Sequence, residues 1–576
     1  MQRHQTGNSP NNRWSMFLVR LGMLVLSALL LPSPIAKQVD AQTASSVVDA
    51  ANGDESRGDQ QACLEIDDYE KLIAYAQQQL EHEYVPPPEL PAIWADLSYE
   101  DFCEITFDYH QAIWSKQNGA ANATSDSTAP FWLESFHRGF VQRNQVELYT
   151  IEEQGVQELP FDPQNFNYGK LAERITPDPS LGHAGFKIAG IFPGPSDAQE
   201  MISFLGGCYF RARTIDTFYG ASARGLALDI AMNKPEEFPA FTKFWIRKPE
   251  PESPHIVVLA YLDGPRVSGA YELIFEPEKL ASVIDIRATV FFRKPVEKIG
   301  VAPITSMWMW GDGLAGPPKD KRPGVHDSDG LLIHGVSSST LDPSPDPAEP
   351  KWYWRPFARQ AYPSVSFQRM QQVVGFGAMQ RNRAFFHYDD HNARYDKRPS
   401  VWIQPAEPWS QGRVELLELP GAHEGIDNIG IYWVPDTTPA AGEALTLNYS
   451  VSFSAWEPAD HKHLGRMTNM QLQRSKKSKS VAMELRFSGP VLQDVGPEKI
   501  VQVAAFVRGG KLITSGVTRT ETNDWIAKVK FEISGDAPAE LELKLLDNSG
   551  DLTETVTYLC PPQEPEFQYP SVYTRE

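Results

Sequence analysis

Two short acidic segments carry residue types that could cleave or transfer a glycosidic bond. Residues 325–330 read VHDSDG and set Asp327 beside an apolar run, and residues 425–430 read GIDNIG and do the same for Asp427. Glycoside chemistry needs one carboxylic acid to protonate the leaving oxygen and a second group to activate water. An aspartate in a turn usually caps backbone groups, so either residue taken alone is better explained as structural.

Aromatic residues crowd into the same part of the chain, between residues 308 and 433. Flat sugar faces stack well on aromatic rings, while sugar hydroxyls reach nearby polar groups. Core packing is the better explanation for any single tryptophan, so the sugar hypothesis depends on rings that adjoin polar clusters. It predicts five substrate-binding residues: Trp308, Trp310, Trp354, Arg355 and Trp433.

A dense polar block at residues 380–395, QRNRAFFHYDDHNARY, supplies further candidates. Such a mixture of arginine, histidine and tyrosine could line a sugar groove, and it could equally form a surface ion-pair network. The substrate-binding residues predicted here are Arg381, Arg383, His387 and Tyr388.

The overall charge argues for a neutral ligand. A formal net charge of −21 disfavours nucleic acid and anionic membrane surfaces, because both require a basic face. The sequence contains no convincing dinucleotide fingerprint, P-loop or nucleophile elbow, and no metal-ligand spacing, so we expect no cofactor and no metal. Of the four cysteines, Cys63 and Cys103 share the N-terminal segment, where an oxidising compartment would permit a bridge.

The N-terminus has the pattern of an export signal. Arg3, Arg13 and Arg20 precede an apolar run at residues 21–31, which is followed by prolines and small residues. We therefore expect a signal peptide at residues 1–41, a disordered leader at 42–60, and a periplasmic location. No later segment resembles a transmembrane helix, so no transmembrane segment is expected after signal cleavage.

The elements that would position these residues are mostly strands. Apolar spacing predicts one helix over residues 67–84, ended by three prolines. Short β-branched and aromatic runs then recur, for example at 140–151, 256–262, 282–293 and 414–419. Without strand–helix alternation, this pattern favours a large antiparallel β-sandwich over residues 61–455.

A second unit is expected at the C-terminus. Residues 456–479 are polar and basic with little periodicity, which predicts a linker. Alternating runs at 483–487, 501–507, 525–533 and 541–545 then predict an immunoglobulin-like β-sandwich over 480–576, used for packing or interaction. The predicted fold class is therefore all-β, with two sandwiches.

Ordered blocks over roughly residues 85–455 resemble the periplasmic glucans biosynthesis proteins G and D. One of these blocks adds Tyr219 and Arg224 to the candidate substrate-binding residues. The blocks include FHRG at 136–139, LGHAGF at 181–186, YGASARGLA at 219–227, GVAPITSM at 300–307, HDSDG at 326–330 and RYDKRPS at 394–400.

The resemblance implies a galactose-mutarotase-like large sandwich joined to an immunoglobulin-like domain. It also implies an inverting hydrolase or transglycosylase acting on β-1,2-glucan, in which Asp427 looks like the general acid and Asp327 like the base. The alternative is a non-catalytic glucan-binding assembly factor that works with the membrane glucan synthase. The expected partners are thus a β-glucan polysaccharide and, through possible contact, that synthase.

Overall fold

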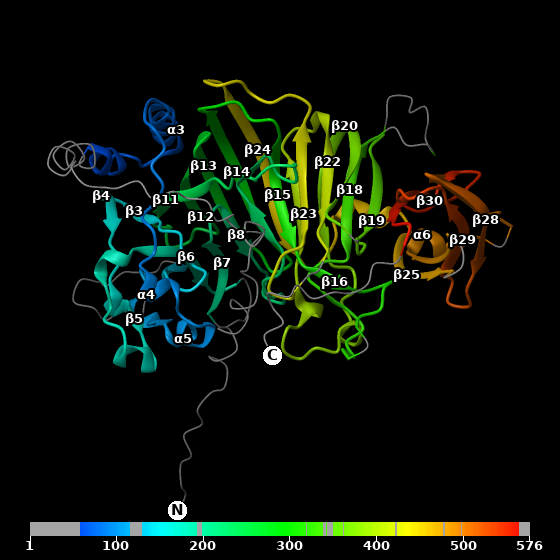
Figure 1. Cartoon of the computed structure of the whole chain (residues 1–576), viewed down its shortest axis with the longest axis horizontal. Coiled ribbons are helices and arrows are strands. Elements are labelled where there is room, and N and C mark those ends of the chain that lie inside the picture. The colour runs from blue at the N-terminus through cyan, green and yellow to red at the C-terminus, as the bar shows by residue number, and fades with distance from the viewer. Residues whose placement is uncertain are drawn as a thin grey trace, which may run out of the picture.

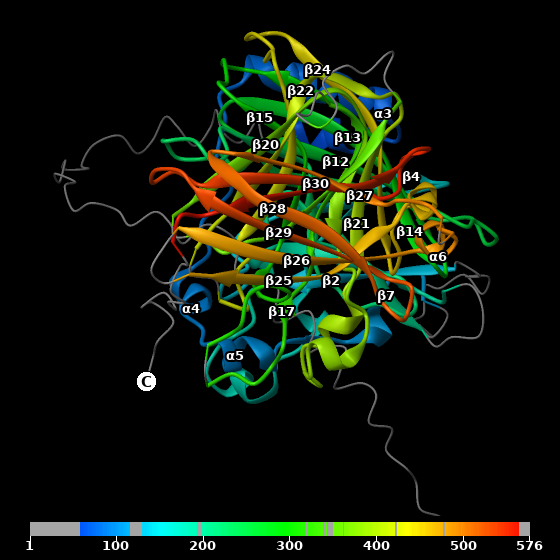
Figure 2. The same ribbon diagram turned by 90° about the vertical axis from the view of Figure 1, so that its right-hand side faces the viewer.

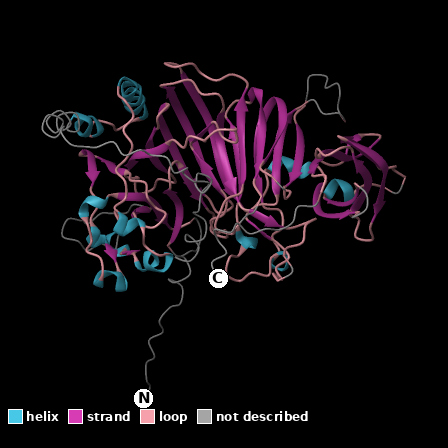
Figure 3. Ribbon diagram, in the orientation of Figure 1, coloured by secondary structure: helices cyan, strands magenta, loops and turns pink. Residues whose placement is uncertain are grey.

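Strands dominate the structure, and short helices gather at its N-terminal end (Figures 1 and 3). The computed structural model describes residues 58–115, 130–192, 198–317, 319–337, 341, 349–360, 362–420, 423–475, 479–496 and 498–563. The predicted signal peptide and all but the last three residues of the predicted leader lie outside these ranges. The prediction of an all-β sandwich protein is confirmed.

One layer of the large sandwich is antiparallel except where β11 runs parallel to β3. Its long strands alternate buried and exposed residues, as a sheet with one solvated face should. Predicted strands 256–262 and 282–293 are its β12 and β14. In spatial order the layer comprises β4 (Gly155–Leu159), β3 (Glu147–Glu152), β11 (Ala240–Arg247), β12 (Ile256–Asp263), β13 (Val267–Pro277), β14 (Ala281–Phe292), β24 (Ala444–Ser454) and β21 (Ser400–Pro405).

The second layer packs against the first. In spatial order it comprises β2 (Phe131–His137), β6 (His183–Gly190), β7 (Gln199–Leu205), β8 (Tyr209–Ala212), β9 (Ser222–Arg224), β15 (Ile299–Ser306), β23 (Ile429–Pro435) and β22 (Trp409–Glu418), with β10 (Leu226–Leu228) also on β15. The small ladder of β16 (Trp308–Trp310) and β17 (Val325–His326) follows β15.

The long strand β20 (Ser364–Met379) joins the two layers. Its first part pairs with β22 and its last part with β21, so the sheet turns from one layer into the other along this strand. β18 (Gly330–Val336) pairs with β20, and β19 (Lys351–Pro356) pairs with β18. The core between the layers takes Leu273 and Ile286 from one side and Phe204 and Ile431 from the other, all at most 1% exposed.

The helix predicted over residues 67–84 is present in a shorter form, α3 (Tyr69–Gln78) followed by η2 (Gln79–Glu81). Asp68 caps its N-terminus by accepting a hydrogen bond from the Lys71 amide. The apolar face of α3 covers the outer side of β12 and β13. Cys63 and Cys103 are not bridged. None of the described helices is long and apolar enough to span a membrane.

The C-terminal domain is a second sandwich (Figure 2). One sheet orders β25 (Arg466–Arg474), β26 (Ser480–Ser488), β29 (Trp525–Ile533) and β28 (Gly510–Arg519); the other holds β27 (Gln502–Arg508), β30 (Ala539–Asp547), β31 (Gly550–Asp551) and β32 (Thr555–Cys560).

The segment predicted as a linker, 456–479, contains the strand β25 and, before it, the short helix η9 (Ala459–His463). A register shift between Met467 and Asn469 breaks the alternation of buried and exposed residues along this strand. That bulge, together with the many polar side chains of an edge strand, removes the periodicity by which a strand is recognised in sequence. The domain boundaries themselves stay a prediction.

The two sandwiches share a sheet. β32 of the C-terminal domain pairs in parallel with β19 of the large domain, with Tyr353 opposite Thr555 and Trp354 opposite Val556. A single hydrophobic cluster takes Trp354 from the large domain and Leu543 from the C-terminal domain. The C-terminal domain is therefore built onto the edge of the large sandwich.

Candidate active site

Asp427 lies just before β23, at the end of the second layer. β23 begins at Ile429, which pairs with Ser306, the last residue of β15. The Asn428 amide N–H donates to the Ser306 carbonyl at 3.0 Å. The Asn428 side chain accepts from the Trp308 N–H at 2.8 Å and donates to the Trp308 carbonyl at 2.9 Å. The loop that carries Asp427 is thus fixed on residues 306–308.

Asp327 lies beside the same residues, 306–308, at the end of the β16–β17 pair. It directly follows β17, which pairs with β16, and its N–H donates to the Met307 carbonyl at 2.8 Å. Next to it, the hydroxyls of Ser328 and Ser306 lie 2.9 Å apart. Both predicted catalytic aspartates are therefore attached, by backbone hydrogen bonds, to residues 306–308.

The Asp427 carboxylate is buried, with 7% of the residue exposed. The Thr305 hydroxyl donates to its Oδ2 at 2.8 Å, and Nη2 of Arg211 lies 3.7 Å from the same oxygen. Arg211 is itself oriented by its Nε donating to the Ser222 hydroxyl at 2.5 Å. Burial raises the pKa of Asp427 above its ordinary value, and the charge of Arg211 and the Thr305 hydrogen bond only partly oppose this.

Asp327 is equally buried and faces a second arginine. Nε of Arg398 lies 3.3 Å from its Oδ1. Arg398 is held by donating to the carbonyls of Ala393, at 2.7 Å, and of Tyr219. Burial raises the pKa of Asp327, the charge of Arg398 opposes the rise, and the charge of Asp427 adds to it. The charge of Asp427 is thus close enough to affect the ionisation of Asp327.

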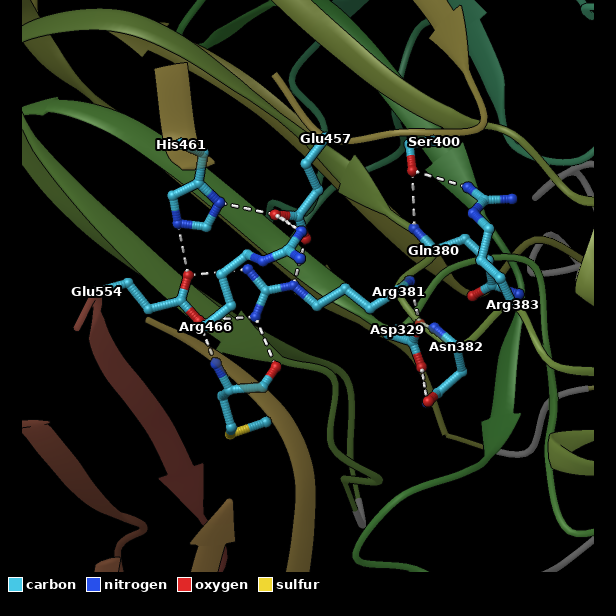
Figure 4. Close-up of polar contacts among 11 residues, drawn as sticks. Asp329, Gln380, Arg381, Asn382, Arg383, Ser400, Glu457, His461, Arg466 and Glu554 are labelled. Carbon is cyan, nitrogen blue, oxygen red and sulfur yellow. Dashed lines mark hydrogen bonds and ion pairs between the residues drawn. The ribbon is translucent and has the colours of Figure 1, made fainter. Parts of the chain in front are cut away.

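The segment that follows β20 connects this site to its surroundings (Figure 4). The Gln380 amide donates to the carbonyls of His326 and Tyr395, and its oxygen lies 3.0 Å from Nδ1 of His326. Arg383 donates to the Arg398 carbonyl at 2.6 Å and to the Ser400 hydroxyl at 3.2 Å. Burial lowers the pKa of Arg383 to about 10. Gln380 thus positions His326, which precedes Asp327, and Arg383 positions Arg398, which faces Asp327.

Arg381, between them, points into the C-terminal domain (Figure 4). Its Nε lies 2.5 Å from Glu457, its two terminal nitrogens lie 2.7 and 2.8 Å from Glu554, and its guanidinium stacks 3.5 Å from the centre of the Trp354 ring. His461 contacts both glutamates, at 2.7 and 2.9 Å. The polar block at residues 380–395 could line a sugar groove or form an ion-pair network. Arg381 belongs to an ion-pair network, which is buried rather than on the surface.

The predicted sugar platforms are buried. Trp310, Trp354, Trp433 and Trp308 are 0, 1, 3 and 5% exposed. The Trp310 indole N–H donates to the Arg322 carbonyl at 2.9 Å, and the other three rings belong to the large hydrophobic clusters. These four rings pack inside the protein, because adjacency to polar residues in sequence does not set which way a ring faces. Their role in binding sugar stays a prediction.

Three other predicted residues also have internal partners. Arg224 lies between the rings of Tyr209 and Phe238, 4.9 Å from each centre, and pairs with Glu236 at 3.0 Å. Arg355 pairs with Glu540 of the C-terminal domain at 3.1 Å. The Tyr388 hydroxyl donates to the Asn382 carbonyl and its ring is fully buried. His387 is partly exposed and lines a cavity.

Three groups that face the two aspartates were not predicted from the sequence: Arg211, Arg398 and Thr305. Arg398 stands within the block RYDKRPS and Thr305 within GVAPITSM. For Arg398 and Thr305 the signal in the sequence was a polar residue near a strand end, within a block that resembles the family. Arg211, inside a short buried strand, gave no such signal.

Comparison with known proteins shows the family. Residues 68–560 match the family model described as periplasmic glucan biosynthesis protein, MdoG. The chain is 33% identical over 493 residues to glucans biosynthesis protein G of Serratia proteamaculans, covering 83% of this chain and 90% of that protein. It is 34% identical over 507 residues to the protein of the same name from Ralstonia nicotianae, covering 85% and 95%.

Solved structures give weaker matches. A GH36 α-galactosidase, AgaB, from Geobacillus stearothermophilus is 10% identical, with a TM-score of 0.23 over 47% of this chain and 39% of that one. This similarity carries no argument about function. The family model and the relatives together place the protein: the chain belongs to the MdoG family of periplasmic glucan biosynthesis proteins.

Proposed function

We propose that this protein is a periplasmic inverting glycoside hydrolase or transglycosylase that acts on β-1,2-glucan. Asp427 is the general acid and Asp327 the general base. The observation that supports this assignment is the attachment of both loops to residues 306–308, which brings two buried carboxylates into one electrostatic environment. The substrate class comes from the family and the names of the relatives, which concern glucan biosynthesis.

The chemistry needs a protonated donor and an ionised acceptor. The raised pKa of Asp427 favours its protonated form, which delivers a proton to the departing glycosidic oxygen. Burial raises the pKa of Asp327 as well, and the charge of Arg398 offsets part of that rise; in its ionised form Asp327 takes a proton from the attacking water, or from a sugar hydroxyl in transfer. The new bond forms on the face opposite the departing group, so the anomeric configuration inverts.

Incubating the purified protein with linear β-1,2-glucan tests the proposal. Shorter or rearranged chains should appear on sizing chromatography, and NMR should show the α-anomer as the first product of hydrolysis. Asp427→Asn and Asp327→Asn should each slow turnover by about 10²- to 10⁴-fold. Asp285→Asn, an exposed aspartate on β14, is the matched control and should leave the rate unchanged. Full activity in Asp427→Asn would refute the assignment.

A non-catalytic glucan-binding assembly factor working with the membrane glucan synthase is the second candidate. Two observations favour it: the relatives are named for biosynthesis, and both aspartates are less than a tenth exposed. It predicts that the same glucan binds the wild-type protein and leaves with its length distribution unchanged, at any enzyme concentration and incubation time.

A further inference from the structure

A cavity of about 270 Å³ lies where the large sandwich meets the C-terminal domain. One side of the cavity is formed by residues 311–315, 323, 324 and 326 with Asn382 and His387, and the other side by residues 469–471 of β25. Ligand pockets in proteins usually measure about 300–1,000 Å³. This cavity is therefore sized for one small unit rather than for a length of polymer.

The lining suits a neutral, hydroxyl-rich ligand. Carboxylate, carboxamide and imidazole groups together offer both donors and acceptors, which a ring of hydroxyls requires. Leu314, Pro323 and Met470 supply apolar surface beside them. Among the described lining residues none is lysine or arginine, so nothing there favours an anion. The polar lining residues are Asp312, His326, Asn382, His387, Asn469 and Gln471.

The C-terminal domain supplies part of the cavity wall. The bulge between Met467 and Asn469 alters the direction of side chains along β25, a common use of bulges near functional sites. Asn469 hydrogen-bonds the Asp312 carboxylate, which also accepts from the Asn382 amide at 3.3 Å. Burial and the charge of Asp329 raise the pKa of Asp312 to about 6, as expected for a carboxyl group withdrawn from water.

Glycines let the large domain approach β25 closely. Gly313 has a φ of 82°, and a Cβ there would lie 2.6 Å from the Met470 methyl group. A Cβ at Gly311 would lie 3.0 Å from the His326 ring. His326 links the cavity to the proposed catalytic pair, because it lines the wall and directly precedes Asp327.

We propose that this interdomain cavity binds one sugar residue of the glucan and that Asn469 completes it from the C-terminal domain. The inference rests on the proposed function, since it places an additional binding position next to the proposed base. It gives the C-terminal domain a direct share in substrate binding, beyond packing against the large sandwich.

Calorimetric titration of a linear β-1,2-gluco-oligosaccharide tests the inference in an Asp427→Asn background, where binding is measured without turnover. Adding Asn469→Ala should weaken binding about 3- to 10-fold, the loss expected for one hydrogen bond. Asp312→Asn, on the opposite wall, should also weaken it. Gln473→Ala is the matched control, because Gln473 is exposed on the same strand and does not line the cavity.

The outcomes separate the two proposals. Unchanged affinity in both Asn469→Ala and Asp312→Asn, with the parent binding normally, would overturn the cavity as a sugar site and leave the proposed function standing. A wild-type protein that cleaves no glucan, with the Asn469 effect still seen in the Asp427→Asn parent, would support the cavity and refute the catalytic assignment. A wild-type protein that neither binds nor cleaves glucan would overturn both. Thermal unfolding of each variant checks that it is folded.

Discussion

Replacing Arg381 by methionine should cost a large part of the protein's stability. Its side chain is 9% exposed, and those of its partners Glu457 and Glu554 are 6% and 0% exposed. Burial by itself would raise the pKa of both glutamates, and the charge of Arg381, aided by His461, reverses this and lowers the pKa below the ordinary range. Arg381 therefore keeps two buried carboxylates ionised at the junction of the domains.

The magnitude follows from what the substitution leaves behind. Methionine retains apolar contact with the Trp354 ring but removes the charge and the hydrogen bonds at 2.5, 2.7 and 2.8 Å. Removing one partner of a buried ion pair typically costs about 3–5 kcal/mol, because the other charge stays buried and uncompensated. We expect a loss in this range for Arg381→Met at pH 8. The loss should be smaller at pH 5, where the glutamates, no longer held ionised, take up protons.

Urea unfolding at both pH values measures this. Arg369→Met is the matched control, because the Arg369 side chain is 62% exposed and its pair with Asp436 is on the surface. Such pairs contribute about 0–1 kcal/mol. If Arg381→Met costs no more than Arg369→Met, or if its cost is independent of pH, the reasoning about the buried cluster is wrong.

Three further predictions concern single positions. Burial raises the pKa of Glu418 from the usual 4.5 to about 7, so between these pH values the folded protein holds a proton that the unfolded chain releases. The free energy of unfolding should therefore fall by about 3 kcal/mol as the pH rises from 4.5 to 7. Glu418→Gln should remove this pH dependence in urea unfolding. Gly377→Ala should destabilise by about 1–3 kcal/mol or more, because a Cβ there meets the backbone of β21, whereas Gly516→Ala, with open space around it, should be nearly neutral in thermal unfolding. Thr305→Val removes a donor to Asp427 and should raise its pKa, which moves the alkaline limb of the pH–kcat/KM profile to higher pH; an unmoved limb would argue against Asp427 as the acid.

Local periodicity accounts for the parts of the fold that could be predicted. Strand β29 was expected at residues 525–533 and occupies Trp525–Ile533, because its side chains alternate strictly between the core and solvent. The helix α3 shows the matching 3.6-residue pattern. The location of Asp327 and Asp427 at strand ends was likewise predictable from the apolar runs beside them.

Two kinds of feature could not be predicted: the direction in which a side chain points, and contacts between residues far apart in the sequence. A tryptophan in a strand has the same neighbours in sequence whether its ring faces the core or solvent, so the burial of Trp310 and Trp354 could not be predicted. Arg381 finds Glu554 across a domain boundary, and no local pattern encodes that contact. The bulge in β25 hid a strand within a segment that looked like a linker.

The pairing of β19 with β32 has a consequence for how the protein is made. Synthesis proceeds from the N-terminus, so the edge of β19 has its backbone groups unmatched until Thr555–Cys560, the final described strand, has left the ribosome. An uncovered strand edge invites pairing with other chains. A polypeptide that stops short of this strand would thus be a seed for aggregation, even with every residue of the proposed catalytic centre in place.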